Sequence, residues 1–210
     1  MITHHLDGKS GRHLLPELRE LIEDHVFKFG RIPKSFLDCD PVQMACDIAL
    51  ALAQCDIREV GGNNMGHTVG LIQDVIGGVT PGGNGLAWCM SMQQVIVAFI
   101  EDYLQKESPF PADLEVLSVY QLALKVPGLV SVTCEQGAVA CARHGDTSNG
   151  HAMLVLQAGP GNIMTTFEGN TNLAGSRDGD GAYIKTRDKF RNGNLQTLGF
   201  VRIYPKEQSK

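Results

Sequence analysis

The apolar residues of the first 125 positions recur every three or four residues, which is the spacing of one face of an α-helix. This pattern predicts five helices, at residues 14–29, 41–55, 66–78, 89–105 and 112–125. Asp40 and Pro41 suit the cap and the first residue of the second helix. In the fourth helix the apolar residues continue nearly all the way round, which is typical of a helix at the centre of a domain.

The pattern changes to short apolar or alternating runs after Pro127 and Gly128. These runs are separated by Gly, Asn and Asp and predict about five strands, at residues 138–143, 151–158, 162–169, 181–186 and 198–204. Helices that precede a series of closely spaced strands are typical of an α+β domain. We therefore expect an antiparallel sheet of about five strands packed on the central helix.

Composition narrows the class of protein. The chain has 210 residues, 43% hydrophobic and 20% charged, which is enough for one domain with a sizeable core. Its formal net charge is −5 and it has no run of Lys and Arg, so we do not expect nucleic acid as a partner. The most apolar stretch, residues 95–100, is too short to span a membrane.

The first residues contain no apolar core behind a basic start, so they do not resemble a Sec signal. We therefore expect synthesis in the cytoplasm, with any export by another route. The six cysteines form no CxxC pair, and the chain is not a small secreted scaffold, so neither structural zinc nor a disulfide framework is expected. Cys46, and with it Cys39 and Cys55, is interpreted as a small buried hydrophobic residue. No cofactor and no required metal are predicted.

The segment GLAWCMSMQQ, residues 85–94, places Cys89 where a Gly-rich loop becomes the apolar central helix. The unpaired N–H groups at a helix start favour a thiolate over a thiol, and they can also bind the oxyanion of a tetrahedral intermediate. Cys89 is therefore a candidate nucleophile. The alternative is a core cysteine beneath a core tryptophan, Trp88.

A thiolate nucleophile needs an imidazole that can take and return a proton. Among seven histidines, His151 follows Gly150 at the start of an apolar strand, a rigid position at the edge of a cleft. His144 and His67, both in loops, are the alternatives. The next strand ends with Glu168 and Asn170, and antiparallel pairing would place Glu168 beside His151 to orient the imidazole. Each of these two residues alone could equally belong to a turn.

Several segments together resemble the family of cysteine, histidine-dependent amidohydrolases/peptidases (CHAP), whose fold is papain-like. They are GLAWCMSMQQV, GHAMLVL and TTFEGNTN, with REVGGNNMGHTV upstream and GDGAYIKTRD and LGFVRIY downstream. The resemblance covers about residues 57–205 and leaves 1–56 as a helical segment of unknown role. It departs from the family at the expected Pro-Gly-Asp, of which only Gly137 remains, and at Ser91, where calcium-binding members carry Asp.

The resemblance implies that Cys89 is the nucleophile, His151 the base and acid, Glu168 the orienting carboxylate and Asn170 a supporting polar group. Trp88 beside the thiol, and Asn63 and Asn64 in the upstream loop, are candidate substrate-binding residues.

The implied function is hydrolysis of an amide bond in a peptidoglycan stem peptide or cross-bridge through a thioester, as in phage lysins or delivered antibacterial effectors. The site of action would be the cell wall or periplasm, and an immunity protein or a carrier would be further partners. Two alternatives stay open: a non-catalytic module of the same fold that binds the wall or assembles a particle, and a thiol acyltransferase or amidase for another substrate.

Overall fold

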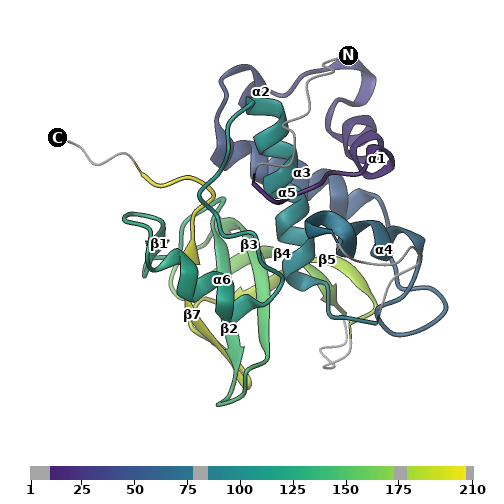
Figure 1. Cartoon of the computed structure of the whole chain (residues 1–210). Helices are drawn as coiled ribbons and strands as arrows, with labels where there is room; N and C mark the ends of the chain where they lie inside the picture. The colour runs from purple at the N-terminus through teal and green to yellow at the C-terminus, as the bar shows by residue number, and fades with distance from the viewer. Residues whose placement is uncertain (1–9, 78–84, 173–178, 207–210) are drawn as a thin grey trace.

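A computed structural model describes residues 10–77, 85–172 and 179–206 of the chain (Figure 1). Its first half is helical and its second half is made of strands, in the order that the sequence pattern predicts. The helical elements are α1 (Pro16–Val26), η1 (Lys28–Gly30), α2 (Lys34–Leu37), α3 (Pro41–Gln54), α4 (His67–Gln73), η2 (Asp74–Ile76), α5 (Cys89–Leu104) and α6 (Val116–Ala123), where η marks a 3₁₀-helix.

One antiparallel sheet contains all the strands of the described residues. They are β1 (Val130–Ser131), β2 (Val139–His144), β3 (Gly150–Ala158), β4 (Ile163–Thr171), β5 (Gly181–Asp188), β6 (Arg191–Asn192) and β7 (Leu195–Val201). Their order across the sheet is β1-β7-β2-β3-β4-β5, and β6 pairs with β7. The α+β class and the antiparallel sheet are confirmed. The five longer strands are the predicted ones, and β1 and β6 are two-residue additions.

Hydrogen bonds, local in one case and tertiary in the other, explain where helices α3 and α6 begin. The Asp40 side chain accepts from the backbone N–H groups of Val42 (3.1 Å) and Gln43 (3.4 Å), so α3 begins at the expected cap. Helix α6 begins at Val116, four residues later than predicted. The reason is tertiary, because the backbone carbonyls of Pro111 and Asp113 accept hydrogen bonds from a side chain of α5 instead of starting a helix.

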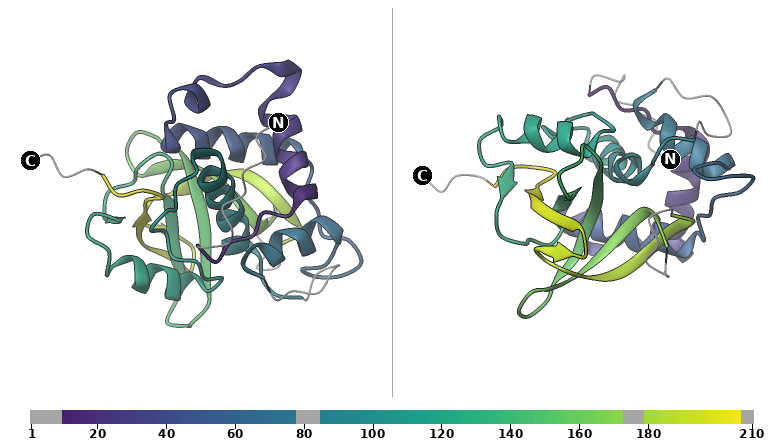
Figure 2. Two further views of the ribbon diagram at one scale, coloured as in Figure 1. Left: turned by 45° about the horizontal axis from the view of Figure 1, so that its top comes forward. Right: turned by 90° about the horizontal axis from the view of Figure 1, so that it is seen from below.

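Helix α5 lies at the centre of the structure, in contact with β3, β4 and α3. Figure 2 shows α5 and α6 together on one face of the sheet. All the residues of α5 from Cys89 to Glu101 are buried, which agrees with the apolar pattern around this helix. A second, smaller hydrophobic cluster, which includes Met153, Val155 and Phe200, covers the other face of the sheet.

Residues 10–56 share the core with the rest of the chain. Leu18 and Ile22 of α1, and Ile48 of α3, belong to the same hydrophobic cluster as α5 and the sheet. Arg12 is also buried, and its guanidinium contacts Glu101 of α5 at 3.0 Å. The helices before residue 57 therefore support the helix on which the candidate nucleophile lies. No helix among the described residues combines the length and apolarity needed to cross a bilayer.

Candidate active site

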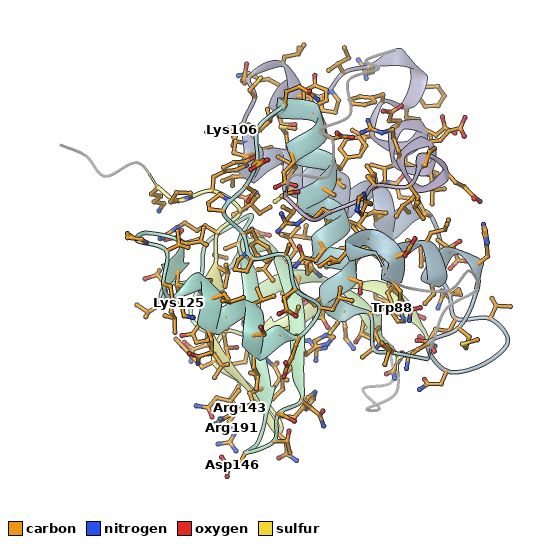
Figure 3. The ribbon with its side chains drawn as sticks, viewed as in Figure 1. Trp88, Lys106, Lys125, Arg143, Asp146 and Arg191 are labelled. Atoms are coloured by element: carbon orange, nitrogen blue, oxygen red, sulfur yellow. The ribbon has the colours of Figure 1, made fainter. Side chains whose placement is uncertain are left out.

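Cys89 is the first residue of α5, directly after Trp88. Its side chain is almost fully buried, with 5% of the residue exposed, and it lines a cavity of about 390 Å³ that opens to solvent. We call this the thiol cavity; its other lining residues include Asn63, Asn64, Glu115, His151 and Asn170. Trp88 and Lys106, labelled in Figure 3, mark the two ends of this helix.

His151 is the second residue of β3 and reaches the thiol from the sheet. Strand alternation places it on the same face as Met153 and Val155, which belong to the second hydrophobic cluster. The imidazole forms a hydrogen bond with the Cys89 thiol, and its Nε2 lies 2.9 Å from Glu168 Oε2. Because Nε2 faces the carboxylate, Nδ1 is the nitrogen left to face the sulfur.

Glu168 is fully buried on β4, the strand beside β3. Besides His151, its carboxylate accepts two hydrogen bonds from Arg187, at 2.7 and 2.6 Å, and one from the Thr166 hydroxyl at 2.6 Å. Burial raises the pKa of Glu168, but the hydrogen bonds from Arg187 and His151 outweigh it and hold this pKa well below its usual range. A charged carboxylate therefore stands behind the imidazole.

The same interactions set the charge of the thiol and the imidazole. Burial raises the pKa of Cys89. The hydrogen bond and positive charge of His151 lower it, and so do the backbone N–H groups of Ala152 and Met90. Together these contacts outweigh burial, so the pKa of Cys89 lies below its ordinary value. For His151, burial lowers the pKa, and the bonds to Cys89 and Glu168 raise it above its ordinary value. These directions favour a thiolate–imidazolium pair.

Asn170 lies on the thiol side of the site and holds Trp88, the residue before Cys89. It has a left-handed backbone (φ 52°) at the bulge between Glu168 and Thr171. With its amide oriented so that donors face acceptors, Asn170 accepts a hydrogen bond from the Trp88 backbone N–H (3.3 Å) and donates one to Glu59 Oε1 (3.2 Å). Its amide therefore positions the start of α5.

Glu59 is a site residue to which the sequence analysis gave no role. Its Oε1 accepts from the Trp88 indole N–H (2.9 Å) and its Oε2 from the Asn64 backbone N–H (2.8 Å). This half-buried carboxylate thus connects the upstream loop with the residue that precedes Cys89. The motif REVGGNN contained Glu59, but a carboxylate in a Gly-rich loop gives no signal of a partner 29 residues away.

The two upstream asparagines occupy different positions. Asn64 is buried, and its side-chain amide donates to the Gly85 carbonyl (3.0 Å), so it fixes the loop that leads to Cys89. Asn63 is exposed and lines the thiol cavity. Of the two, Asn63 is therefore better placed to meet a substrate.

Trp88 has no exposed surface, and it is not placed to contact a substrate directly. Its ring packs against Gly169, where an added Cβ would lie only 2.8 Å from the ring. The position of Trp88 is that of a core residue which shapes the wall behind the thiol. The prediction of Trp88 as a substrate-binding residue thus requires correction to an indirect role.

The remaining cysteines differ from Cys89. All six are free thiols. Burial raises the pKa of Cys46 and of Cys55 to about 11 and that of Cys141 to about 12, which leaves them protonated at neutral pH. Cys39 is exposed, contrary to the expectation of a buried residue, because it follows the short helix α2 in a left-handed turn (φ 52°).

A second cavity, of about 370 Å³, lies beside the thiol cavity and shares His144, His151 and Asn170 with it. We call it the lysine cavity because Lys185 lines it, together with Thr171 and Arg187. Cys89 is not among its lining residues. His151 and Asn170 therefore form a boundary between two chambers of one cleft.

In the described part of the chain, no group of three or more His, Cys, Asp or Glu side chains is arranged to hold a metal ion. In the acidic segment DGDG, residue 178 lies outside the described residues, and Gly179 and Asp180 precede β5.

Comparison of the chain with models of protein families, with curated proteins and with solved structures gives no match.

Proposed function

We propose that the protein is a cysteine-dependent amide hydrolase of papain-like arrangement that acts on peptidoglycan. The observation that carries the proposal is the continuous chain of contacts from the Cys89 thiol through His151 to the buried carboxylate of Glu168. A buried carboxylate, an imidazole and a thiol at a helix start are the three parts that thiol hydrolases use.

In the first step the Cys89 thiolate attacks the carbonyl carbon of the scissile amide and a tetrahedral oxyanion forms. The backbone N–H groups of the first turn of α5 lack intrahelical partners and can donate to this oxyanion. The exposed Asn63 amide, on the wall of the thiol cavity, is the proposed second donor. The imidazolium of His151 then protonates the nitrogen, and the amine departs to leave a thioester on Cys89.

In the second step a water molecule replaces the amine. Neutral His151 takes a proton from this water, whose oxygen attacks the thioester carbonyl. The acid product leaves, and the proton returns the pair to imidazolium and thiolate. Throughout, Glu168 stabilises the charged imidazolium, while Arg187 and Thr166 hold Glu168 in place.

The substrate class rests on the resemblance of residues 57–205 to the CHAP family. The proposed substrate is an amide bond of a peptidoglycan stem peptide or cross-bridge, and the proposed site of action is the cell wall or periplasm, reached after lysis or by delivery. An immunity protein or a carrier is the proposed further partner in that setting.

The test is the release of muropeptides from purified sacculi, measured by mass spectrometry, for the unmodified protein and for Cys89→Ala. Cys39→Ala is the matched control, because Cys39 is exposed and outside both cavities. We expect products from the unmodified protein and from Cys39→Ala, and none from Cys89→Ala. Equal release by all three would refute the proposal. Products only in the presence of an added amine would indicate acyl transfer instead.

A further inference from the structure

The two chambers of the cleft differ in charge. The lysine cavity is lined by Lys185 and Arg187, and among the described residues no Asp or Glu lines it. The thiol cavity has the opposite character, since Glu115 lines it and no Lys or Arg of the described residues does. A substrate that spans both chambers therefore meets a positive surface on one side of His151 only.

Lys185 supplies the charge that is available to a ligand. The charge of Arg187 is already paired with Glu168 through two hydrogen bonds. Among the described residues Lys185 forms no ion pair, and its ammonium donates to the backbone carbonyl of Asn172. An ammonium group has three N–H donors, so this contact leaves others for a ligand.

The charges around Lys185 do not balance the positive charge of its ammonium group. Burial and the neighbouring Arg187 lower the pKa of Lys185, and the negative charges of Glu168 and Asp180 only partly compensate. Neither carboxylate is available to it, because Glu168 is held by Arg187 and His151, and Asp180 accepts from the Tyr183 hydroxyl at 2.7 Å.

The positions of Cys89 and His151 indicate which half of a substrate each cavity would hold. Cys89 and His151 both line the thiol cavity, whereas only His151 lines the lysine cavity. The carbonyl carbon must meet the sulfur and the nitrogen must meet the imidazole that protonates it. The amine half of the substrate therefore extends past His151, towards Lys185.

We propose that the lysine cavity binds the departing amine half of the substrate and that Lys185 recognises a carboxylate on it. This inference rests on the proposed function. The ligand class is an amino acid or short peptide whose carboxylate lies within a residue or so of the scissile nitrogen. In a stem peptide two groups satisfy this chemistry: the carboxylate of a C-terminal residue and the α-carboxylate of a γ-linked glutamate.

Three synthetic peptides distinguish these sources. The first is N-acetyl-L-alanyl-γ-D-glutamyl-L-lysyl-D-alanine with both carboxylates free. The second has the C-terminal carboxylate replaced by a carboxamide, and the third has the glutamate α-carboxylate replaced in the same way. Binding of each peptide to Cys89→Ala is measured by calorimetry. We expect one of the two amidated peptides to bind about 10- to 100-fold more weakly than the parent, as for loss of one charge-assisted hydrogen bond.

Substitutions at Lys185 test whether this residue is responsible. In the Cys89→Ala background, Lys185→Met should bind the parent and the amidated peptide equally, and Lys185→Arg should keep most of the difference. Lys125→Met is the matched control, because Lys125 is exposed at the end of α6, away from Trp88 and the start of α5 (Figure 3). Circular dichroism checks that each variant is folded. If a Lys185 variant does not fold, binding of the three peptides to Cys89→Ala still tests the inference.

The outcomes separate this inference from the proposed function. Equal binding of the three peptides, binding of none of them, or a difference that persists in Lys185→Met would each overturn the inference. Cleavage of all three peptides at the same rate would overturn the inference. Together with Cys89-dependent cleavage of sacculi, it would leave the proposed hydrolase intact. A Lys185-dependent binding difference without Cys89-dependent cleavage of any substrate would support the inference and refute the hydrolase.

Discussion

Replacement of Glu168 by Gln should raise the pKa of the Cys89 thiol while leaving the shape of the site nearly unchanged. The thiolate is stabilised mainly by the charged imidazole of His151, and this charge is stabilised by the Glu168 carboxylate at 2.9 Å. An amide in place of the carboxylate removes the negative charge. The His151 pKa should therefore fall, and the Cys89 pKa should rise as its cationic partner is lost.

The magnitude follows from the contacts of the carboxylate. A hydrogen bond to a charged group contributes about 1.5–3 kcal/mol, and 1.36 kcal/mol corresponds to one pH unit. Loss of the negative charge should thus lower the His151 pKa by about 1 to 2. The free energy of unfolding should also fall by about 3 kcal/mol, the lower end of the range for a broken buried ion pair, since the Arg187 side chain is 18% exposed.

The assay is alkylation of Cys89 by iodoacetamide as a function of pH, with each cysteine followed separately by peptide mass spectrometry. The exposed Cys39 serves as the internal reference. In the unmodified protein the Cys89 rate should rise at a pH below the ordinary thiol midpoint of about 8.5, and in Glu168→Gln the midpoint should move upward. Thr166→Val, which removes a neutral donor and keeps the charge, should move it much less.

Two results would refute this reasoning. One is the same Cys89 midpoint in the unmodified protein and in Glu168→Gln at temperatures where both are folded. The other is an unmodified midpoint at or above that of Cys39.

Further predictions follow from individual contacts. Asn63→Ala should lower kcat/KM by about 10- to 100-fold with an unchanged melting temperature. Asn64→Ala should instead lower the melting temperature, because it frees the loop that leads to Cys89. The reverse pattern would exchange the roles of the two asparagines. Gly169→Ala should cost about 1–3 kcal/mol in denaturant unfolding, since its Cβ would meet a tryptophan ring at 2.8 Å, and an unchanged midpoint would contradict this packing. Glu135→Gln should destabilise the protein by about 1 kcal/mol at neutral pH. The pKa of Glu135 is lowered to about 2, chiefly by its hydrogen bond with Arg202, so this difference should shrink as the pH falls from about 4 towards 2 and vanish below that pKa. A difference that is as large at about pH 2 as at neutral pH would exclude the charge as its cause.

Local patterns in the sequence were sufficient for the parts of the fold that depend on neighbouring residues. The start of α5 at Cys89 and the cap of α3 at Asp40 were predictable because a helix terminus is specified within one turn. The contact between His151 and Glu168 was predictable because consecutive antiparallel strands pair, and a two-residue period sets which side chains share a face.

The partners of these residues were less accessible to sequence reasoning. Arg187 carried only a partial signal. Strand β5 follows β4 in the chain and alternate side chains of β5 share a face with Glu168, but the register pairs Glu168 with Tyr183 and Arg187 with Met164. Glu59 carried none, because its partners come together only when the upstream loop folds against α5. The burial of Trp88 was equally hidden, since a tryptophan beside a nucleophile suits both a cavity wall and a core.

The segment Glu168-Gly169-Asn170 joins the two halves of the site. Glu168 faces the imidazole on the sheet side, and at the bulge that follows, the left-handed backbone of Asn170 turns its amide towards the Trp88 N–H on the helix side. Gly169, between them, admits the Trp88 ring against the backbone. A regular strand would direct residues two apart to the same face. The bulge therefore lets three consecutive residues fix the imidazole of His151 and the start of α5 together. The separation of thiol and imidazole thus depends on the conformation of a single strand.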